Sequence, residues 1–225
     1  MINATLLRRA LAEAVGAFGL VFAGTGAIMI DAESGGMIGH LGIGLTFGLI
    51  IMVMIYATGH ISGAHFNPAV TIAFAAARHF PLSNVPVYIL AQLAGAVAAS
   101  ALLRAMFGGI ADLGATFPAG SDSQSFILET VLTFFLMFVI IAVATDVRAV
   151  GQAAAIAIGG TVGLEAIFAG PISGASMNPA RSLAPALLSG TWESQWLYIA
   201  APVLGALAGA FVYVVIRAVP QEETA

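Results

Sequence analysis

The chain has 225 residues, of which 60% are hydrophobic and 8% are charged, and its formal net charge at pH 7 is −4. An ordinary soluble domain carries about 25% charged residues, so this composition excludes a water-soluble enzyme and favours an all-α integral membrane protein. All basic residues are arginines and cysteine is absent, which excludes a basic nucleic-acid surface and thiolate metal sites. We therefore expect a lipid bilayer around the chain, with no nucleic-acid partner and no cofactor.

Six long apolar segments are predicted to be transmembrane helices, because each approaches the roughly 20 residues that a span requires. Between them lie two connections, 59–80 and 170–188, that are too apolar for solvated loops and that each hold a short helix-compatible stretch after an Asn-Pro pair. Such short segments cannot cross a bilayer, so we predict that both are re-entrant half-helices. The predicted spans are 9–30, 40–58, 86–106, 125–145, 150–169 and 195–217.

Arginine placement predicts that both termini are cytoplasmic, because short inner loops carry an excess of basic residues. Arg104, near the outer end of the third span, breaks this pattern. The predicted inner residues are Arg8, Arg9, Arg78, Arg148 and Arg217, and the predicted outer acids are Asp31, Glu33, Asp112, Asp122 and Glu193.

The two odd connections repeat each other. His60–Ala69 reads HISGAHFNPA and Pro171–Ala180 reads PISGASMNPA, so that Ile, Ser-Gly-Ala and Asn-Pro-Ala recur in register. The spans that begin the two halves also correspond, with Glu13 in AEAVGAFGLVFAG and Glu129 in LETVLTFFLMFVI. The sequence is therefore interpreted as a duplication.

Each half of this duplication holds three spans, so the second half enters the membrane with the opposite polarity. We predict one membrane channel domain over residues 1–225, built from inverted repeats at approximately 1–112 and 120–225. Inverted repeats with broken helices place their functional site near the bilayer midplane.

The Asn-Pro-Ala triplets are candidate pore motifs. Pro suits the first position of a helix and Asn is a strong cap, and each helix N-terminus contributes roughly half a positive charge. Two such ends meeting at the centre would repel cations. The Asn amides and the Ser-Gly-Ala carbonyls would form hydrogen bonds with small neutral solutes. The alternative, ordinary caps on surface loops, is disfavoured by the duplication. The motif residues are Asn67, Pro68, Ala69, Asn178, Pro179 and Ala180.

These features resemble the aquaporin, or major intrinsic protein, family over essentially the whole chain. The resemblance is carried by Glu13, GHISGAHFNPAVT at 59–71, Glu129 and AGPISGASMNPARS at 169–182. It implies an aquaporin-like bundle of six tilted helices and two half-helices, a homotetramer with one pore per subunit, and no enzymatic activity. In the family, acids equivalent to Glu13 and Glu129 support the re-entrant loops, although a proton relay is a second interpretation.

The resemblance also implies a selectivity filter of four positions, which fall here on Phe47, Ala166, Ala175 and Arg181. Strictly water-selective members usually have His at the place of Ala166, so two alanines imply a wider constriction. The first filter position is often Trp in the plant nodulin-like intrinsic proteins and their bacterial relatives, to which these motifs are closest.

That subgroup passes glycerol and metalloid acids such as arsenite or boric acid. We therefore expect a passive channel for water and small uncharged solutes that excludes ions and protons, in a bacterial inner (plasma) membrane. Two alternatives remain open: a strictly water-selective aquaporin and, in another class, a secondary transporter built on the inverted repeat.

Further residues carry structural expectations. Three roles remain open for Glu165, which lies beside a filter position: a bond to the second re-entrant loop, the positioning of Arg181, or a subunit contact. Trp192, Trp196 and Tyr198 are expected to form an interfacial belt. Small residues that permit close helix contact in membranes are Gly16, Gly24, Gly48, Gly95, Gly163, Gly205 and Gly209.

Overall fold

The computed structural model describes residues 4–145 and 153–217, and the predicted inner position of Arg148 lies outside the described residues. Two short 3-10 helices, η1 (Leu82–Asn84) and η2 (Ile110–Gly114), connect longer elements. The α-helices are α1 (Ala4–Glu33), α2 (Gly39–Ser62), α3 (Pro68–Ala76), α4 (Val85–Phe107), α5 (Asp122–Thr145), α6 (Ala154–Ser173), α7 (Pro179–Ser189) and α8 (Leu197–Ile216).

Six helices in the described part of the chain are long and apolar enough to cross a membrane, namely all except α3 and α7. The predicted all-α fold with six spans is thus confirmed. The two short helices begin at the Pro residues of the two Asn-Pro-Ala triplets.

Two spans extend beyond their predicted ends, because α2 continues to Ser62 and α6 to Ser173. Each ends at a glycine in the left-handed region, with φ of 90° at Gly63 and 82° at Gly174. Only glycine adopts that conformation without a steric cost, and it commonly terminates helices in this way. The Ser-Gly pair, and not the preceding apolar residues, therefore fixes where the loop begins.

Pro171 lies inside α6 without ending it. A proline has no N–H for the carbonyl four residues earlier, which is that of Ile167. This carbonyl is instead 2.7 Å from Nε2 of His40 on α2. The replacement bond allows the helix to continue through the proline.

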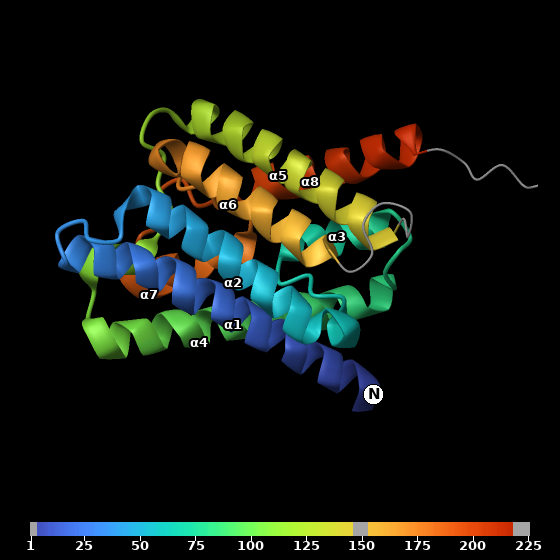
Figure 1. The fold of residues 1–225 in the computed structure, drawn as a ribbon, viewed down its shortest axis with the longest axis horizontal. Coiled ribbons are helices and arrows are strands. Elements are labelled where there is room, and N and C mark those ends of the chain that lie inside the picture. Colours follow the sequence, from blue (N-terminus) through green and yellow to red (C-terminus); the bar gives the residue numbers. More distant parts are fainter. Residues whose placement is uncertain (1–3, 146–152, 218–225) are drawn as a thin grey trace, which may run out of the picture.

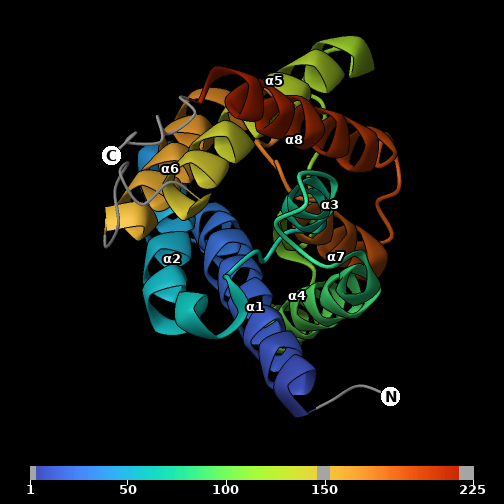
Figure 2. The ribbon, with the colours of Figure 1, turned by 90° about the vertical axis from the view of Figure 1, so that its right-hand side faces the viewer.

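The long helices pack as related pairs around the two short ones. α1 packs against α4 and α2, α5 packs against α8 and α6, and α2 packs against α6. Figure 2 shows α3 and α7 between α4 and α8, and both short helices contact both of these spans. α1 begins and α8 ends at the same end of the bundle, on the right of Figure 1.

Most of the singled-out glycines allow helix backbones to touch. A Cβ at Gly48, Gly95, Gly205 or Gly209 would lie within 3 Å of a carbonyl oxygen on the neighbouring helix, and one at Gly163 would be in ordinary contact. Close approach through small residues is a normal basis of helix association in membranes. Gly16 and Gly24 of α1 differ, because they face the aromatic rings of Phe66 and Phe47.

Candidate functional site

The starts of the two short helices are capped by asparagine side chains. Oδ1 of Asn67 accepts a hydrogen bond from the backbone N–H of Ala69 at 2.9 Å. Oδ1 of Asn178 accepts from the N–H groups of Ala180 at 3.0 Å and Arg181 at 3.4 Å. Both asparagines are extended and both are followed by Pro at the first helical position, as an N-cap requires.

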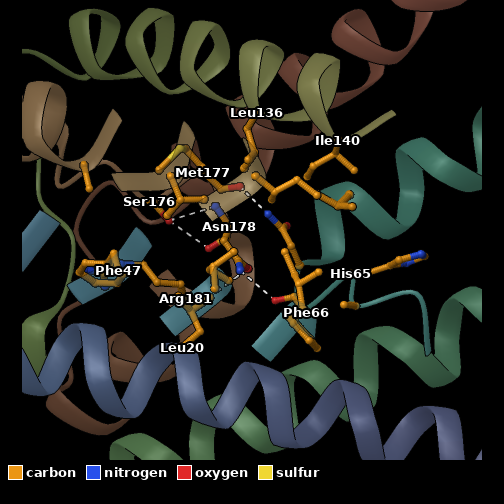
Figure 3. A pocket seen from close by; sticks show the side chains of 18 of the residues that line it. Leu20, Phe47, His65, Phe66, Leu136, Ile140, Ser176, Met177, Asn178 and Arg181 are labelled. Carbon is orange, nitrogen blue, oxygen red and sulfur yellow. Dashed lines mark hydrogen bonds between the residues drawn. The ribbon is translucent and has the colours of Figure 1, made fainter. Parts of the chain in front are cut away.

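The two caps also join the two loops to each other. Nδ2 of Asn67 donates to the carbonyl of Met177 at 2.7 Å, and Nδ2 of Asn178 donates to the carbonyl of Phe66 at 2.9 Å (Figure 3). The N-termini of α3 and α7 therefore face one another, and their partial positive charges add. Each amide group has two N–H donors, and the described residues engage only one of them in each asparagine.

The loops before the caps share an unusual backbone. Ala64 and Phe66 have φ of 51°, and Ala175 and Met177 have φ of 41° and 54°. Positive φ is uncommon for residues with a Cβ and persists where surrounding contacts enforce it. The matching positions in the two loops indicate that both are held by similar contacts.

Glu13 of α1 supplies those contacts for the first loop. Its Oε1 accepts from Ser62 Oγ at 2.7 Å and from the N–H of His65 at 3.0 Å. Its Oε2 accepts from the N–H of Phe66 at 2.7 Å and from Nε2 of Gln92 at 2.8 Å. Both carboxyl oxygens are therefore occupied by the loop and by α4.

Glu129 of α5 holds the second loop in the same manner. Its Oε1 accepts from Ser173 Oγ at 2.7 Å and from the N–H of Ser176 at 2.8 Å, and its Oε2 accepts from the N–H of Met177 at 2.7 Å. Neither glutamate side chain is exposed. A fixed loop backbone is the direct consequence of these bonds.

Two tyrosines complete the support and were missed by the sequence analysis. The hydroxyl of Tyr88 donates to the carbonyl of Ser62 at 2.8 Å, and that of Tyr198 donates to the carbonyl of Ser173 at 2.6 Å. The expected interfacial position of Tyr198 is wrong, because its side chain is fully buried while Trp192 and Trp196 are exposed. An aromatic residue near the start of a span has the same sequence pattern whether it faces lipid or the interior.

A cavity of about 70 Å³ runs past the caps and is lined by residues of both loops and by apolar side chains of the surrounding helices. A single water requires roughly 10–15 Å³ of such volume, so several fit. Phe47, Ala166, Ala175 and Arg181 all line this cavity, as do Asn67 and Asn178. The apolar lining includes Leu20, Ile51, Val70, Leu136, Ile140, Ile158 and Val162.

Arg181 brings a permanent charge to the cavity, although only 2% of its surface is exposed. Its guanidinium carbon lies 5.0 Å from the centroid of the Phe47 ring, and Nη1 donates to the carbonyl of Gly114 at 2.8 Å. Nε has no hydrogen-bond partner in the described part of the chain. The side chain is thus fixed while retaining a free donor.

The segment that holds Arg181 gave no signal in the sequence. In η2, Ala111, Asp112 and Leu113 are consecutive residues with positive φ. This turn presents the Gly114 carbonyl to the arginine. No composition or spacing rule predicts such a conformation for residues with side chains.

Glu165 does not take the first two roles left open for it. Within residues 4–145 and 153–217, no hydrogen bond joins it to the second loop or to Arg181, and its Oε2 has no partner. It does not line the cavity. Because only 4% of its surface is exposed in a single chain, a subunit contact is disfavoured as well.

His65 borders the cavity but is tightly packed. Its ring stacks on Phe74 with centroids 4.8 Å apart, contacts Phe80 and Tyr88, and places Nδ1 3.1 Å from Thr71 Oγ1. These contacts favour a packing role. In the described ranges, no group of three or more His, Asp or Glu side chains is arranged to hold a metal ion.

The comparisons with known proteins agree with this geometry. The profile of the Major intrinsic protein family matches residues 1–213. The chain belongs to the major intrinsic protein family. This membership confirms the predicted family and makes the chain a multi-pass membrane channel and not an enzyme.

Its similar proteins include plant members of this family. Aquaporin NIP1-1 of Oryza sativa subsp. japonica is 54% identical over 212 residues, which cover 94% of this chain and 75% of that protein. Nodulin-26 of Glycine max is 51% identical over 218 residues, covering 96% of this chain and 80% of that protein. These relatives are plant proteins, so they give no support to the expected kinship with bacterial members or to a bacterial inner membrane.

A solved structure is also similar in fold. The X-ray structure of the aquaglyceroporin from Plasmodium falciparum aligns with a TM-score of 0.77 at 27% sequence identity, covering 92% of this chain and 93% of that one.

Proposed function

We propose that the chain is a passive pore for water and small uncharged solutes that excludes ions and protons. The observation that carries this proposal is the meeting of two asparagine-capped helix N-termini in one cavity with a buried arginine. The positive field there repels cations, while amide donors and loop carbonyls offer hydrogen bonds to a neutral solute. Apart from Arg181, the lining side chains that come from outside the loops and their caps are apolar, so few polar groups hold a passing solute.

We assign the selectivity filter to Phe47, Ala166, Ala175 and Arg181. Support comes from their common placement on one cavity and from the contact between Phe47 and Arg181. The two alanines leave space that larger side chains would fill, so solutes wider than water are expected to pass. Glycerol and uncharged metalloid acids, such as boric acid or arsenite, are of suitable size and hydrogen-bonding character. The aquaglyceroporin similarity supports this range over strict water selectivity.

A secondary transporter is disfavoured by the state of the buried acids. Such a protein requires an acidic coupling site that can take up an ion near the midplane. Both oxygens of Glu13 and of Glu129 are engaged by the loops. Glu165 lies outside the cavity lining. None of the three is therefore placed to couple transport to an ion.

Stopped-flow swelling and shrinking of proteoliposomes tests the channel class. We expect water and glycerol fluxes that rise linearly with the gradient, have a low activation energy and do not depend on ions. Protein-free liposomes of the same lipid serve as the non-conducting control. Saturable flux driven by a sodium or proton gradient would contradict the proposal.

We also propose that the halves at approximately 1–112 and 120–225 are inverted repeats. The packing of α1 on α4 matches that of α5 on α8, and the short helices α3 and α7 meet at their N-termini. We further propose that both termini are cytoplasmic. The start of α1 and the end of α8 lie at one end of the bundle, where Arg8 and Arg9 are near the start of α1 and Arg217 follows α8. Arg78 lines a hollow together with Val214, near the end of α8. Because the chain has no cysteine, labelling of Arg217→Cys by an impermeant thiol reagent reports the side; labelling from outside intact cells would contradict this orientation.

The functional assembly is proposed to be a homotetramer with one pore per subunit, as the family resemblance implies. Large apolar side chains are exposed on all six long helices, where lipid or a neighbouring subunit would cover them. Native mass spectrometry in a mild detergent is expected to give four chains per particle, and a monomer alone would contradict the assignment.

A further inference from the structure

We propose that Gly24 of α1 is a positioning residue that sets the width of the constriction by providing a seat for the Phe47 ring. The inference rests on the proposed pore and filter and deepens them. Gly24 does not line the cavity itself. It acts through Phe47, which does.

The pore-facing row of α1 shows how this seat is built. Gly16, Leu20 and Gly24 are spaced by four residues, which places them on one face of a helix. Leu20 lines the cavity, while the two glycines flanking it in this row each receive an aromatic ring. On this face of α1, the side chain of Leu20 therefore reaches the cavity, and the positions of Gly16 and Gly24 on either side of it are filled by aromatic rings.

The contact at Gly24 is too close for any side chain. A Cβ there would lie 2.1 Å from Cε1 of Phe47, and 2.5 Å from both Cδ1 and Cζ. Carbon atoms in good contact are about 3.5–4.0 Å apart. The ring edge thus occupies the space that the side chain of any other residue would require.

The surroundings of Phe47 decide where a displaced ring would go. The ring is 8% exposed and forms part of the cavity wall, and the Arg181 guanidinium carbon is 5.0 Å from its centroid. Figure 3 shows Phe47 and Arg181 side by side above α1. A ring pushed away from α1 consequently moves toward the lumen and the arginine, and the opening narrows. A wide constriction therefore requires Gly24 in addition to Ala166 and Ala175.

Gly16 makes a similar seat for Phe66, with a hypothetical Cβ 1.9 Å from the ring. Phe66 also carries backbone bonds to Glu13 and Asn178, so a change there would disturb the loop itself. Gly19 lies on the same helix, but a Cβ there would contact only flexible side chains. The nearest atom would be Cγ of Met54, at 3.4 Å. Gly24 is therefore the informative position, and Gly19 is its matched control.

The test measures water and glycerol permeability in proteoliposomes containing Gly24→Ala, Gly19→Ala, Phe47→Leu or Gly24→Ala/Phe47→Leu. We expect Gly24→Ala to lower the glycerol-to-water ratio about tenfold, which corresponds to about 1.4 kcal/mol of barrier. Gly19→Ala should leave the ratio unchanged. In the Phe47→Leu background, Gly24→Ala should have little effect, because coupled residues give non-additive changes.

Several results would overturn the inference. One is an unchanged ratio in Gly24→Ala. Another is an equal drop on adding Gly24→Ala to the wild type and to the Phe47→Leu variant. If Gly24→Ala does not fold, the double variant Gly24→Ala/Phe47→Leu tests the proposal. The proposal requires the double variant to fold and to conduct like Phe47→Leu. Failure of the double variant to fold would contradict the proposal.

The proposed function fails separately. A wild-type protein that passes water but no glycerol would contradict the proposed solute range. The role of Gly24 would then be tested by water permeability alone. Water permeability should fall in Gly24→Ala and recover when Phe47→Leu is added.

Discussion

The two re-entrant segments, 63–76 and 174–189, are built on one plan and differ in a few side chains. Each is held from outside by a buried glutamate that accepts from the serine hydroxyl at the end of the preceding helix and from two loop N–H groups. A tyrosine hydroxyl donates to the carbonyl of that serine. Each asparagine then donates to the opposite loop. The shared bonds fix the backbone and therefore explain why two loops with left-handed residues persist inside a membrane.

The two segments differ in the side chains that take no part in these shared hydrogen bonds. The first packs His65 among Phe74, Phe80 and Tyr88, with Arg9 over the last two rings. The second places Arg181 in the cavity, where the matching position of the first segment holds the apolar Val70. We infer that common residues maintain the pore and that unmatched ones give it selectivity on one side.

The largest expected effect comes from removing either glutamate. Glu13→Ala and Glu129→Ala each leave at least three buried donors unsatisfied, at about 1–3 kcal/mol for each donor. We expect both variants to lose folded protein, measured as the yield of monodisperse particles in detergent. Glu165→Gln is the control, because its Oε2 has no partner in the described residues. Normal yield and conduction in both alanine variants would show that the hydrogen bonds from the glutamates to the loops are unnecessary.

The second effect concerns the unmatched charge. Arg181→Val makes the second segment resemble the first, and a unit charge 4 Å away contributes about 4 kcal/mol at an effective dielectric constant of 20. Cation and proton leakage should therefore rise by up to roughly a thousandfold, since each 1.36 kcal/mol is about a factor of ten. A pH-sensitive dye inside proteoliposomes measures this leakage.

Val70→Ala is the matched control for that experiment, because it alters the equivalent position without changing charge. We expect it to leave proton leakage at the wild-type level. Equal leakage from Arg181→Val and the wild type would refute the role given to the arginine.

The smallest effect is expected from the tyrosine pair. Tyr88→Phe and Tyr198→Phe each remove one buried hydrogen bond, of 2.8 Å and 2.6 Å, and each should cost about 1 kcal/mol. The two variants should lower the thermal unfolding temperature of the purified protein by similar amounts. A large drop for only one of them would show that the two supports are not equivalent.

The spans and the central motifs could be predicted because their signals are local. Apolar length indicates a span, and Asn-Pro marks a helix start. The helix ends were less accurate, since Gly63 and Gly174 terminate the spans through left-handed backbone that hydropathy does not register.

The family resemblance implied the loop contacts of Glu13 and Glu129, which the structure shows. Other contacts from distant parts of the chain could not be predicted. Tyr88 and Tyr198 bind the last residues of α2 and α6, far from them in sequence, and the carbonyl of Gly114 reaches Arg181 through a turn of left-handed residues. The role of Gly24 was equally hidden, because a glycine that seats a ring has the same sequence pattern as one that contacts a helix. These features depend on the three-dimensional packing and leave no periodic trace.

The most direct test of a wide, neutral-solute filter compares wild type and Ala166→His for glycerol and water permeability in the same proteoliposome preparation. We predict that the imidazole narrows the constriction, so that glycerol flux falls about tenfold more than water flux. A wild type that conducts neither solute, or an equal fall of both in Ala166→His, would contradict the placement of such a filter at these four residues.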